Sequence, residues 1–540
     1  MRHFDLWSLL WLVGDAPHIG LDLFTDSSCW PSGHSILRSD SLLVLFLGGV
    51  LTPLVGADAV IIGLVLLGPV LSGWAAEHLA VATFGARWPW SIIAGLAYAF
   101  CGLAGTALLE GHVYFLLSPW LPLLASTGMA ATQPDARLRD GALAGLMWAL
   151  CLLSTAYLGV VATLLVLAML GRAAWRGGWR WGPPLGAMLV AVPVGLVYVG
   201  VFVAGAPEGG AAPLQEQPVH GLRAGSATLA SLAGWTPSMD AAHHSIAPWL
   251  PHVALVLALT SPLILPRRRA ATGWLLLAGL LVAASLGPYV DVPGVAGRVP
   301  WLLVPLTWLE RDVLFHFPAR LLWLAVLILG VVGAAVATRL AERARSRGQR
   351  LAVAALLAFA WLDAVVMPAI PSRGAPVPLA VPTAYQATPT DLGILELAPV
   401  FLDPSWDLEL YTNNLVCSYQ RVHGRPLANA CIGTRTAAAP RRKVTDWLFA
   451  ALLTPAADLS VVEPQLASMG FGAVAFHPDW FPEPDRGVLR EGLLATLGAP
   501  LAVSRDAGEL VEIYPVHGAQ AADRDGHRQA LQALLAEGAP

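Results

Sequence analysis

Carboxylates, imidazoles and indoles gather in the first 40 residues of the chain, ahead of its first long apolar stretch. Asp5, Asp26 and Trp7 lie there among five aspartates, three histidines and three tryptophans. A carboxylate beside a membrane can act as a general base on a sugar hydroxyl or another acceptor, and an indole ring can stack on a sugar or a lipid. The segment therefore predicts either an acceptor-activating site or a solvated loop that tryptophans anchor at the interface.

Two further groups of residues could bind a substrate. Glu110 and His112 lie at the outer end of a predicted span, where they could line a cavity together with Tyr157 or could cap an interfacial helix. Arg311, His316 and Arg320 form a basic cluster where an outer loop meets a span. Because arginine forks bind phosphate oxygens in pairs, this cluster suits a lipid-linked phosphate or pyrophosphate; internal pairing with the acidic residues at positions 310 and 312 is the alternative.

The sequence predicts no metal site, although a divalent metal stays open as a requirement of the reaction. Asp240, His243, His244 and His252 have the residue types of ligands, but their spacing matches no defined site, and a surface loop is the favoured interpretation. Thirteen residues separate Cys417 from Cys431. The pair could form a disulfide worth about 3 kcal/mol, or the two could be buried thiols.

The composition of the whole chain sets the class of protein that must position these residues. The 540 residues are 56% hydrophobic and 13% charged, with a net charge of −4, whereas a soluble domain carries about 25% charged residues. A mean hydropathy of +0.63 excludes a cytosolic enzyme and a disordered chain, and the missing basic charge excludes a nucleic-acid binder. We expect a polytopic membrane protein.

Charge and hydropathy divide this protein into four segments. Residues 1–370 hold 20 arginines and 18 acidic residues, whereas 371–540 hold 12 basic and 18 acidic residues. We predict an outer N-terminal loop at 1–40, a transmembrane domain at 41–370, an extracytoplasmic α/β domain at 371–518 and a C-terminal helical tail at 519–540. The fold class is thus mainly α, with a soluble α/β domain at the end.

About ten stretches approach the roughly 20 apolar residues that a bilayer crossing needs. They are 57–80, 89–107, 115–131, 141–154, 157–171, 184–204, 250–266, 271–287, 319–338 and 351–368. The shorter apolar stretch 41–56 predicts a re-entrant or interfacial helix. In the C-terminal part, strands are expected at Pro399–Leu402, Val461–Val462, Ala473–Phe476 and Leu510–Tyr514, and helices at Val444–Leu453 and Val488–Leu497.

Arginine placement predicts the orientation, because cytoplasmic loops are rich in arginine and lysine. Alternate connections carry most of the arginines of the membrane part, at positions 87, 137, 139, 172, 176, 180, 267–269, 339, 343, 345, 347 and 350. With these in the cytoplasm, residues 1–40, 205–249, 288–318 and all those after 369 lie outside. Because no helix precedes the outer residues 1–40, we expect an upstream hydrophobic segment in frame, which an upstream stop codon without such a segment would contradict.

Short segments along most of the chain are similar to those of one protein family. They are Asp5-Leu6-Trp7 with Trp11, Phe24-Thr25-Asp26, Trp30-Pro31-Ser32-Gly33, Gly111-His112, Trp120-Leu121-Pro122-Leu123, Ser154-Thr155-Ala156-Tyr157, Phe317-Pro318-Ala319-Arg320 and Tyr419-Gln420-Arg421-Val422-His423-Gly424-Arg425-Pro426. In this order they resemble bacterial polytopic membrane proteins with the GT-C glycosyltransferase architecture, in an uncharacterised group with a C-terminal outer-face domain.

The resemblance implies transfer of a sugar from a polyprenyl-phosphate carrier to an acceptor on the outer face of the bacterial inner membrane. It places the essential carboxylate in the first outer loop, at Asp5 with Asp26 second. Arg311 and Arg320 would hold the carrier phosphate, and His112 and Tyr157 would line the cavity. Membrane lipid and the lipid-linked sugar are the expected partners, without a further cofactor or nucleic acid. The alternative is a non-enzymatic scaffold or lipid-handling protein of the cell envelope; a transporter is disfavoured, since no pair of half-helices with midplane charges is evident.

Overall fold

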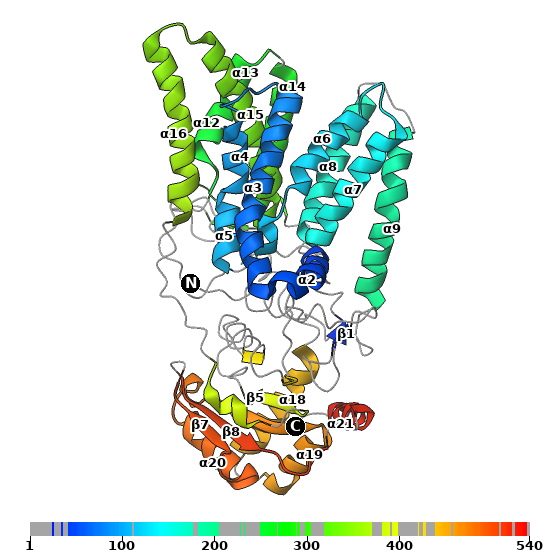
Figure 1. Ribbon diagram of the computed structural model, residues 1–540, viewed down its shortest axis with the longest axis vertical. Helices are drawn as coiled ribbons and strands as arrows, with labels where there is room; N and C mark the ends of the chain where they lie inside the picture. Colours follow the sequence, from blue (N-terminus) through cyan, green and yellow to red (C-terminus); the bar gives the residue numbers. More distant parts are fainter. Residues whose placement is uncertain are drawn as a thin grey trace.

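The computed structural model has a bundle of long apolar helices and a smaller α/β unit beyond one end of the bundle (Figure 1). The structure describes residues 24–25, 34–35, 41–110, 113–175, 182–204, 227, 232, 249–266, 268–287, 289–291, 298–303, 318–369, 381–388, 391–397, 419–420, 425–427, 438–454, 457–506, 509–520 and 524–536. Two short antiparallel strand pairs, β1 (Phe24–Thr25) with β2 (His34–Ser35) and β3 (Tyr289–Asp291) with β4 (Arg298–Pro300), lie in the connections.

The first helices follow the predicted apolar stretches, with interruptions. Ser41 caps α2 (Leu42–Val55) by accepting a hydrogen bond from Val44 N. Gly56, at φ +83°, turns the chain into α3 (Ala57–Phe84), a region of φ that glycine occupies without strain. The later elements of this group are α4 (Ile92–Ala99), α5 (Gly102–Glu110), the 3₁₀ helix η3 (Val113–Leu116) and α6 (Trp120–Ala131).

The remaining helices complete the bundle. Leu138–Ser154 and Ala156–Trp175 form α7 and α8, which pack against each other, and α9 (Gly182–Ala204) packs on α7. The second half holds α12 (His252–Leu259), α13 (Ser261–Ile264), α14 (Arg268–Ser285), the 3₁₀ helix η5 (Pro318–Leu321), α15 (Leu322–Arg343) and α16 (Arg347–Ala369). The central window of Pro318–Arg343 is 100% buried, so α15 is the core helix of the bundle.

Among the described residues, four helical stretches are long and apolar enough to cross a membrane: Ala57–Phe84, Ala156–Ala174, Gly182–Val199 and Pro318–Arg343. Three predicted spans were wrong as continuous helices. The span at 89–107 is interrupted between α4 and α5, that at 115–131 starts as η3 before α6, and that at 250–266 is divided into α12 and α13. Apolar composition does not distinguish a whole helix from a broken one whose backbone is satisfied by its neighbours.

Three of the arginine-bearing connections, those that follow α3, α13 and α15, meet at one end of the bundle. Arg87 N donates to Thr338 Oγ1 at 3.0 Å, and the Arg87 guanidinium lies 3.4 Å from a Glu342 oxygen. Arg343 donates to the Ile264 carbonyl at 3.1 Å. The 22 residues of α15 span about 33 Å at 1.5 Å per residue, which places Arg320 at the opposite end. The next helix, α16, has a similar length and runs back toward the end of the bundle that holds Arg320. The α/β unit that follows it lies beyond that same end (Figure 1).

A four-stranded mixed sheet forms the centre of the α/β unit. Its order is β5 (Gly393–Leu397), β6 (Phe471–Phe476), β8 (Val511–Pro515) and β7 (Ala502–Ser504). The pair β5–β6 is parallel and the other two pairs are antiparallel. One face of the sheet packs against α18 (Ala438–Leu453), α19 (Val462–Ser468), α20 (Asp485–Leu497) and α21 (Arg524–Ala536) through one hydrophobic cluster.

The predicted elements of this unit are confirmed in part. The structure has strands β6 and β8 and helices α18 and α20 where the sequence predicts them. The strand at Val461–Val462 was wrong: Asp458 caps the 3₁₀ helix η7 (Leu459–Val461), which leads into α19. The tail forms α21, which buries Leu531 and Leu534. The expected strand at 399–402 lies outside the described residues, and β5 was not predicted.

Candidate functional site

Arg320 is a buried cation at the end of the bundle that faces the α/β unit. It lies in η5, directly before α15, and is 6% exposed. Its guanidinium carbon is 3.9 Å from the ring centroid of Tyr157 on α8 and 4.7 Å from that of Phe115 on η3. Contacts of this kind are worth about 2 kcal/mol when they are desolvated. Both rings therefore contact the flat guanidinium group of Arg320.

Phe115 can reach Arg320 because the helix is interrupted at η3. Ser72 on α3 satisfies the interrupted backbone: its Oγ donates to the Leu116 carbonyl at 2.8 Å and accepts from Ser118 N at 3.0 Å. Tyr98 on α4 donates to the Ser118 carbonyl at 2.9 Å. A Cβ at Gly68 would lie 2.9 Å from the Leu116 carbonyl carbon, so only glycine allows α3 to approach this closely.

Aromatic contacts continue this support behind Phe115. Trp323, the second residue of α15, stacks on Phe115 with 6.3 Å between centroids and 11° between planes. Tyr98 meets Trp323 edge to face at 5.6 Å, an arrangement that aromatic pairs favour. Arg320 therefore rests on a rigid set of rings and hydroxyls, which suits binding of an anionic group in a fixed place.

We expect Ser72→Ala to lower the free energy of unfolding by about 1–3 kcal/mol, because it leaves the Ser118 amide and the Leu116 carbonyl without their partner in the interior. Unfolding of the purified protein in mixed detergent measures the effect. Ser154→Ala is the matched control: Ser154 is also buried, but its hydroxyl donates only to the Leu150 carbonyl of its own helix. Equal losses in the two variants would contradict the assigned role of Ser72.

The structure brings together two of the residues that the sequence proposes as substrate-binding, Arg320 and Tyr157. Glu110 ends α5, but its side chain is not described. Outside the described residues lie Asp5, Trp7, Asp26, His112, Arg311, His316, Cys417 and Cys431. Sequence reasoning missed Phe115, Ser72 and Tyr98, since an aromatic or hydroxyl residue in an apolar run carries no signal of its own.

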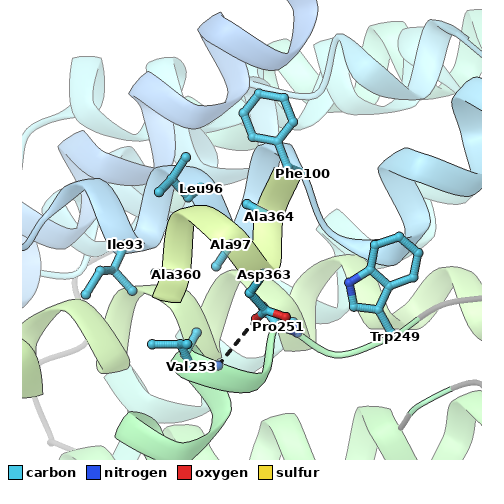
Figure 2. Close-up of a pocket in the computed structure, with 11 residues that line it drawn as sticks. Ile93, Leu96, Ala97, Phe100, Trp249, Pro251, Val253, Ala360, Asp363 and Ala364 are labelled. Carbon is cyan, nitrogen blue, oxygen red and sulfur yellow. Dashed lines mark hydrogen bonds between the residues drawn. The ribbon is translucent and has the colours of Figure 1, made fainter. Parts of the chain in front are cut away.

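A second polar pair lies among the helices and includes His252, which lies in the predicted span 250–266. The predicted surface loop with Asp240, His243 and His244 lies outside the described residues. His252 begins α12, and its Nδ1 lies 2.8 Å from Asp363 Oδ1 on α16. Val253 N donates to Asp363 Oδ2 at 3.4 Å, so Asp363 binds the start of α12 (Figure 2). Asp363 is a single carboxylate inside the predicted span 351–368, and such an isolated charge in an apolar span is a signal for this kind of role.

A cavity beside Asp363 is too small for a sugar or an isoprenoid. Phe100, Trp249 and Ala360 line it together with Asp363 (Figure 2). Its volume of about 10 Å³ is room for about one water molecule. In the part of the chain that the structure describes, no group of three or more His, Cys, Asp or Glu side chains could hold a metal ion. Arg320 with Tyr157 and Phe115 is a buried cation–aromatic cluster among the residues that the structure describes.

No family model matches the chain, and no curated protein matches it. Its fold is similar to that of the arabinofuranosyltransferase AftD from Mycobacteria, with a TM-score of 0.55 and 17% sequence identity over 96% of this chain. A mutant form of the same protein gives a TM-score of 0.50 at 17% identity over 95% of this chain. The chain spans 40% of the length of either structure.

A weaker likeness, with a TM-score of 0.42 and 14% identity, exists to the Archaeoglobus fulgidus oligosaccharyltransferase tethered with an acceptor peptide; it covers 90% of this chain and 66% of that one. A TM-score this low supports no conclusion about the present protein. The similarity to AftD, at a sequence identity below one fifth, establishes a shared fold alone. The chain shares the fold of AftD, the GT-C-like membrane fold that the sequence resemblance predicts.

Proposed function

We propose that the protein is an integral-membrane glycosyltransferase of GT-C type. It transfers a sugar from a polyprenyl-phosphate-linked donor to an acceptor on the outer face of the cytoplasmic membrane. The observation that carries this proposal is the buried Arg320 guanidinium, held between Tyr157 and Phe115 in a fold that AftD shares. A fixed guanidinium near the membrane boundary suits the phosphate of a lipid carrier, because its planar donors match phosphate oxygens.

In this proposal each candidate residue has a defined task. Arg320 binds the carrier phosphate, aided by Arg311 and His316. Tyr157 orients Arg320 and, with Glu110 and His112, lines a substrate cavity, and Trp7 stacks on the sugar or the lipid. Asp5, or Asp26 in second place, removes the proton from the acceptor hydroxyl as its oxygen bonds to the anomeric carbon of the sugar. The bond from that carbon to the carrier phosphate breaks in the same step, and polyprenyl phosphate leaves. The α/β unit, which lies on the side of Arg320, contacts the acceptor.

Mass spectrometry of the lipids that co-purify with the protein in native membrane discs tests the proposal. We expect a polyprenyl-phosphate sugar to be enriched over its share of the total membrane lipid. Recovery of bulk phospholipid alone, in the same proportions as the surrounding membrane, would contradict the proposal and favour the non-enzymatic scaffold or lipid-handling protein. A matched preparation of an unrelated polytopic protein from the same cells corrects for lipids that enter any disc.

A further inference from the structure

The face of the C-terminal sheet away from its four helices carries a buried charged cluster. Side chains alternate along a strand, so Leu395 and Leu397 join the helix-covered core, and Glu396 between them points to the other face. His477 follows β6 directly and meets Glu396 there, with 3.1 Å between Nε2 and Oε2. Both side chains are 0% exposed.

A second carboxylate and two phenols complete the cluster. Glu509, which precedes β8, places Oε2 3.5 Å from His477 Nδ1. Tyr419 donates to the other oxygen of Glu509. Tyr385 Oη lies 2.9 and 3.0 Å from the two Glu396 oxygens and 3.2 Å from His477 Nε2. Hydrogen bonds thus join Tyr385, Glu396 and His477, and Glu509 lies within ion-pair distance of His477, so that a charged imidazolium would face two carboxylates.

No substrate can reach His477, which excludes a catalytic role in this form of the protein. The Trp480 ring lies on the imidazole with 3.7 Å between centroids and 3° between planes. Asp479, an acidic residue two positions after His477 in the chain, does not join the cluster. Its carboxylate accepts a hydrogen bond from the Leu510 amide and pairs with Arg505. The cluster is therefore a buried structural element, and its contribution to stability depends on the charge of the His477 imidazole.

Tyr385 connects this cluster to the segment that follows the last membrane helix. It lies in the 3₁₀ helix η6 (Thr383–Ala387), which begins 14 residues after α16 ends at Ala369. The backbone of η6 also contacts this part of the unit: Thr383 N donates to Asp506 at 3.1 Å and Ala384 N donates to Ser504 Oγ at 3.3 Å. Both of these lie at the exposed edge, whereas Tyr385 makes the buried contact.

We propose that the His477 cluster is a protonation-dependent lock that fastens the connecting segment 381–388 to the C-terminal sheet. With the imidazole charged, Glu396 and Glu509 each face a positive donor, and Tyr385 adds its hydroxyl to Glu396. With the imidazole neutral, two buried carboxylates lose their counter-charge, a change that burial makes costly. The segment then separates from the sheet more readily, and the connection to the membrane helices becomes looser.

The pKa of His477 defines the pH range of the lock. Burial lowers this pKa, but hydrogen bonds and charge from Glu396 and Glu509 outweigh burial and raise it from 6.5 to about 9. Burial and the nearby Glu396 raise the pKa of Tyr385, so its hydroxyl keeps its proton. Because the folded pKa lies above the unfolded one, the stabilisation is complete below about pH 6.5 and is lost as the pH rises through about 9. The difference between the pKa of 6.5 in the unfolded state and about 9 in the folded state sets an upper limit. The equilibrium for separation of segment 381–388 from the sheet can change by at most about 300-fold.

Hydrogen exchange of the full-length protein in membrane discs tests the lock, with rates corrected for the chemical effect of pH. We expect the protection of amides in segment 381–388 to fall at least about 10-fold from pH 7 to pH 10. Tyr385→Phe should raise exchange at pH 7 and remove this pH dependence, because the hydroxyl link is absent. Glu396→Gln should move the fall to lower pH, since it removes a cause of the raised pKa.

His517→Gln is the matched control. His517 also pairs with a carboxylate, Glu463, at 2.7 Å, but its side chain is 74% exposed. The His517→Gln variant should show the same exchange in segment 381–388 as the parent protein. The His477→Gln variant should show faster exchange in this segment at pH 7. Protection that stays constant up to pH 10 in the parent protein, or the same change in the His517 and His477 variants, would overturn the lock. The test is independent of any transferase activity.

Discussion

Arg320→Gln is expected to remove the lipid-linked donor from the purified protein and to lower its transfer rate by about 10²–10³-fold, the effect of losing one preorganised donor of hydrogen bonds to an anion. Glutamine cannot supply the charge or the paired N–H groups that a phosphate binds. Arg320→Lys should retain part of the donor, because the charge stays but the planar fork and its stacking between Tyr157 and Phe115 are lost. The amount of polyprenyl-phosphate sugar per protein, measured by mass spectrometry, is the direct measurement.

The control for this series is an arginine of the opposite end of the bundle. Arg339 pairs with Glu342 at 2.6 Å on the exposed surface, and Arg339→Gln should leave donor content and transfer unchanged. Yield and elution volume show whether each variant folds, and the Arg320→Lys variant retains the charge if Arg320→Gln does not fold. If Arg320→Gln keeps the donor at the parent level, Arg320 does not bind the carrier phosphate.

Asp5→Asn has the opposite signature: the donor stays bound and transfer stops. A general base contributes about 10²–10⁴-fold to such a reaction, and asparagine keeps the size of the side chain but cannot accept the proton of the acceptor hydroxyl. In membranes from cells that express the variant, transferred sugar should be absent while the donor lipid on the protein equals or exceeds the parent amount. Radiolabelled donor lipid and chromatography of the products measure both.

Asp26→Asn is the paired variant that decides between the two carboxylates. If Asp5 is the base, Asp26→Asn lowers transfer by much less than Asp5→Asn. The reverse result would assign the base to Asp26, and parent-level transfer in both variants would remove the first outer loop from the reaction. If the Asp5→Asn variant loses the bound donor lipid, Asp5 acts in donor binding, the task proposed for Arg320, and not as the base.

The membrane class and the order of the helices could be predicted from the sequence, but the continuity of the helices could not. Hydropathy is a property of each stretch of chain, so α3, α8, α9 and α15 were predicted correctly. The break at η3 depends on Ser72 and Tyr98, which lie on other helices and satisfy the backbone that the break exposes. Such compensation is a property of packing, and a hydropathy average does not contain it.

The C-terminal unit shows the same limit. The strands β6 and β8 and the helices α18 and α20 have local patterns that predict them. Glu396 interrupts the apolar pattern of β5, so the pattern did not predict this strand. In the structure the Glu396 side chain is completely buried against His477. The cost of burying this carboxylate is offset by the Tyr385 hydroxyl and by an imidazole 81 residues further along the chain, and no local pattern reveals this pairing.

The sequence by itself determined that this protein is a polytopic membrane protein with GT-C resemblance, that arginines mark one set of connections, and that Arg320 and Tyr157 are candidates for binding. Tertiary structure alone decided which of these residues meet. Arg320 contacts Phe115 and Tyr157 because η5, η3 and the start of α8 converge at one end of the bundle. A site formed by side chains from distant segments depends on how whole helices pack, and packing is fixed by the close fit of all the side chains together rather than by any one stretch of sequence.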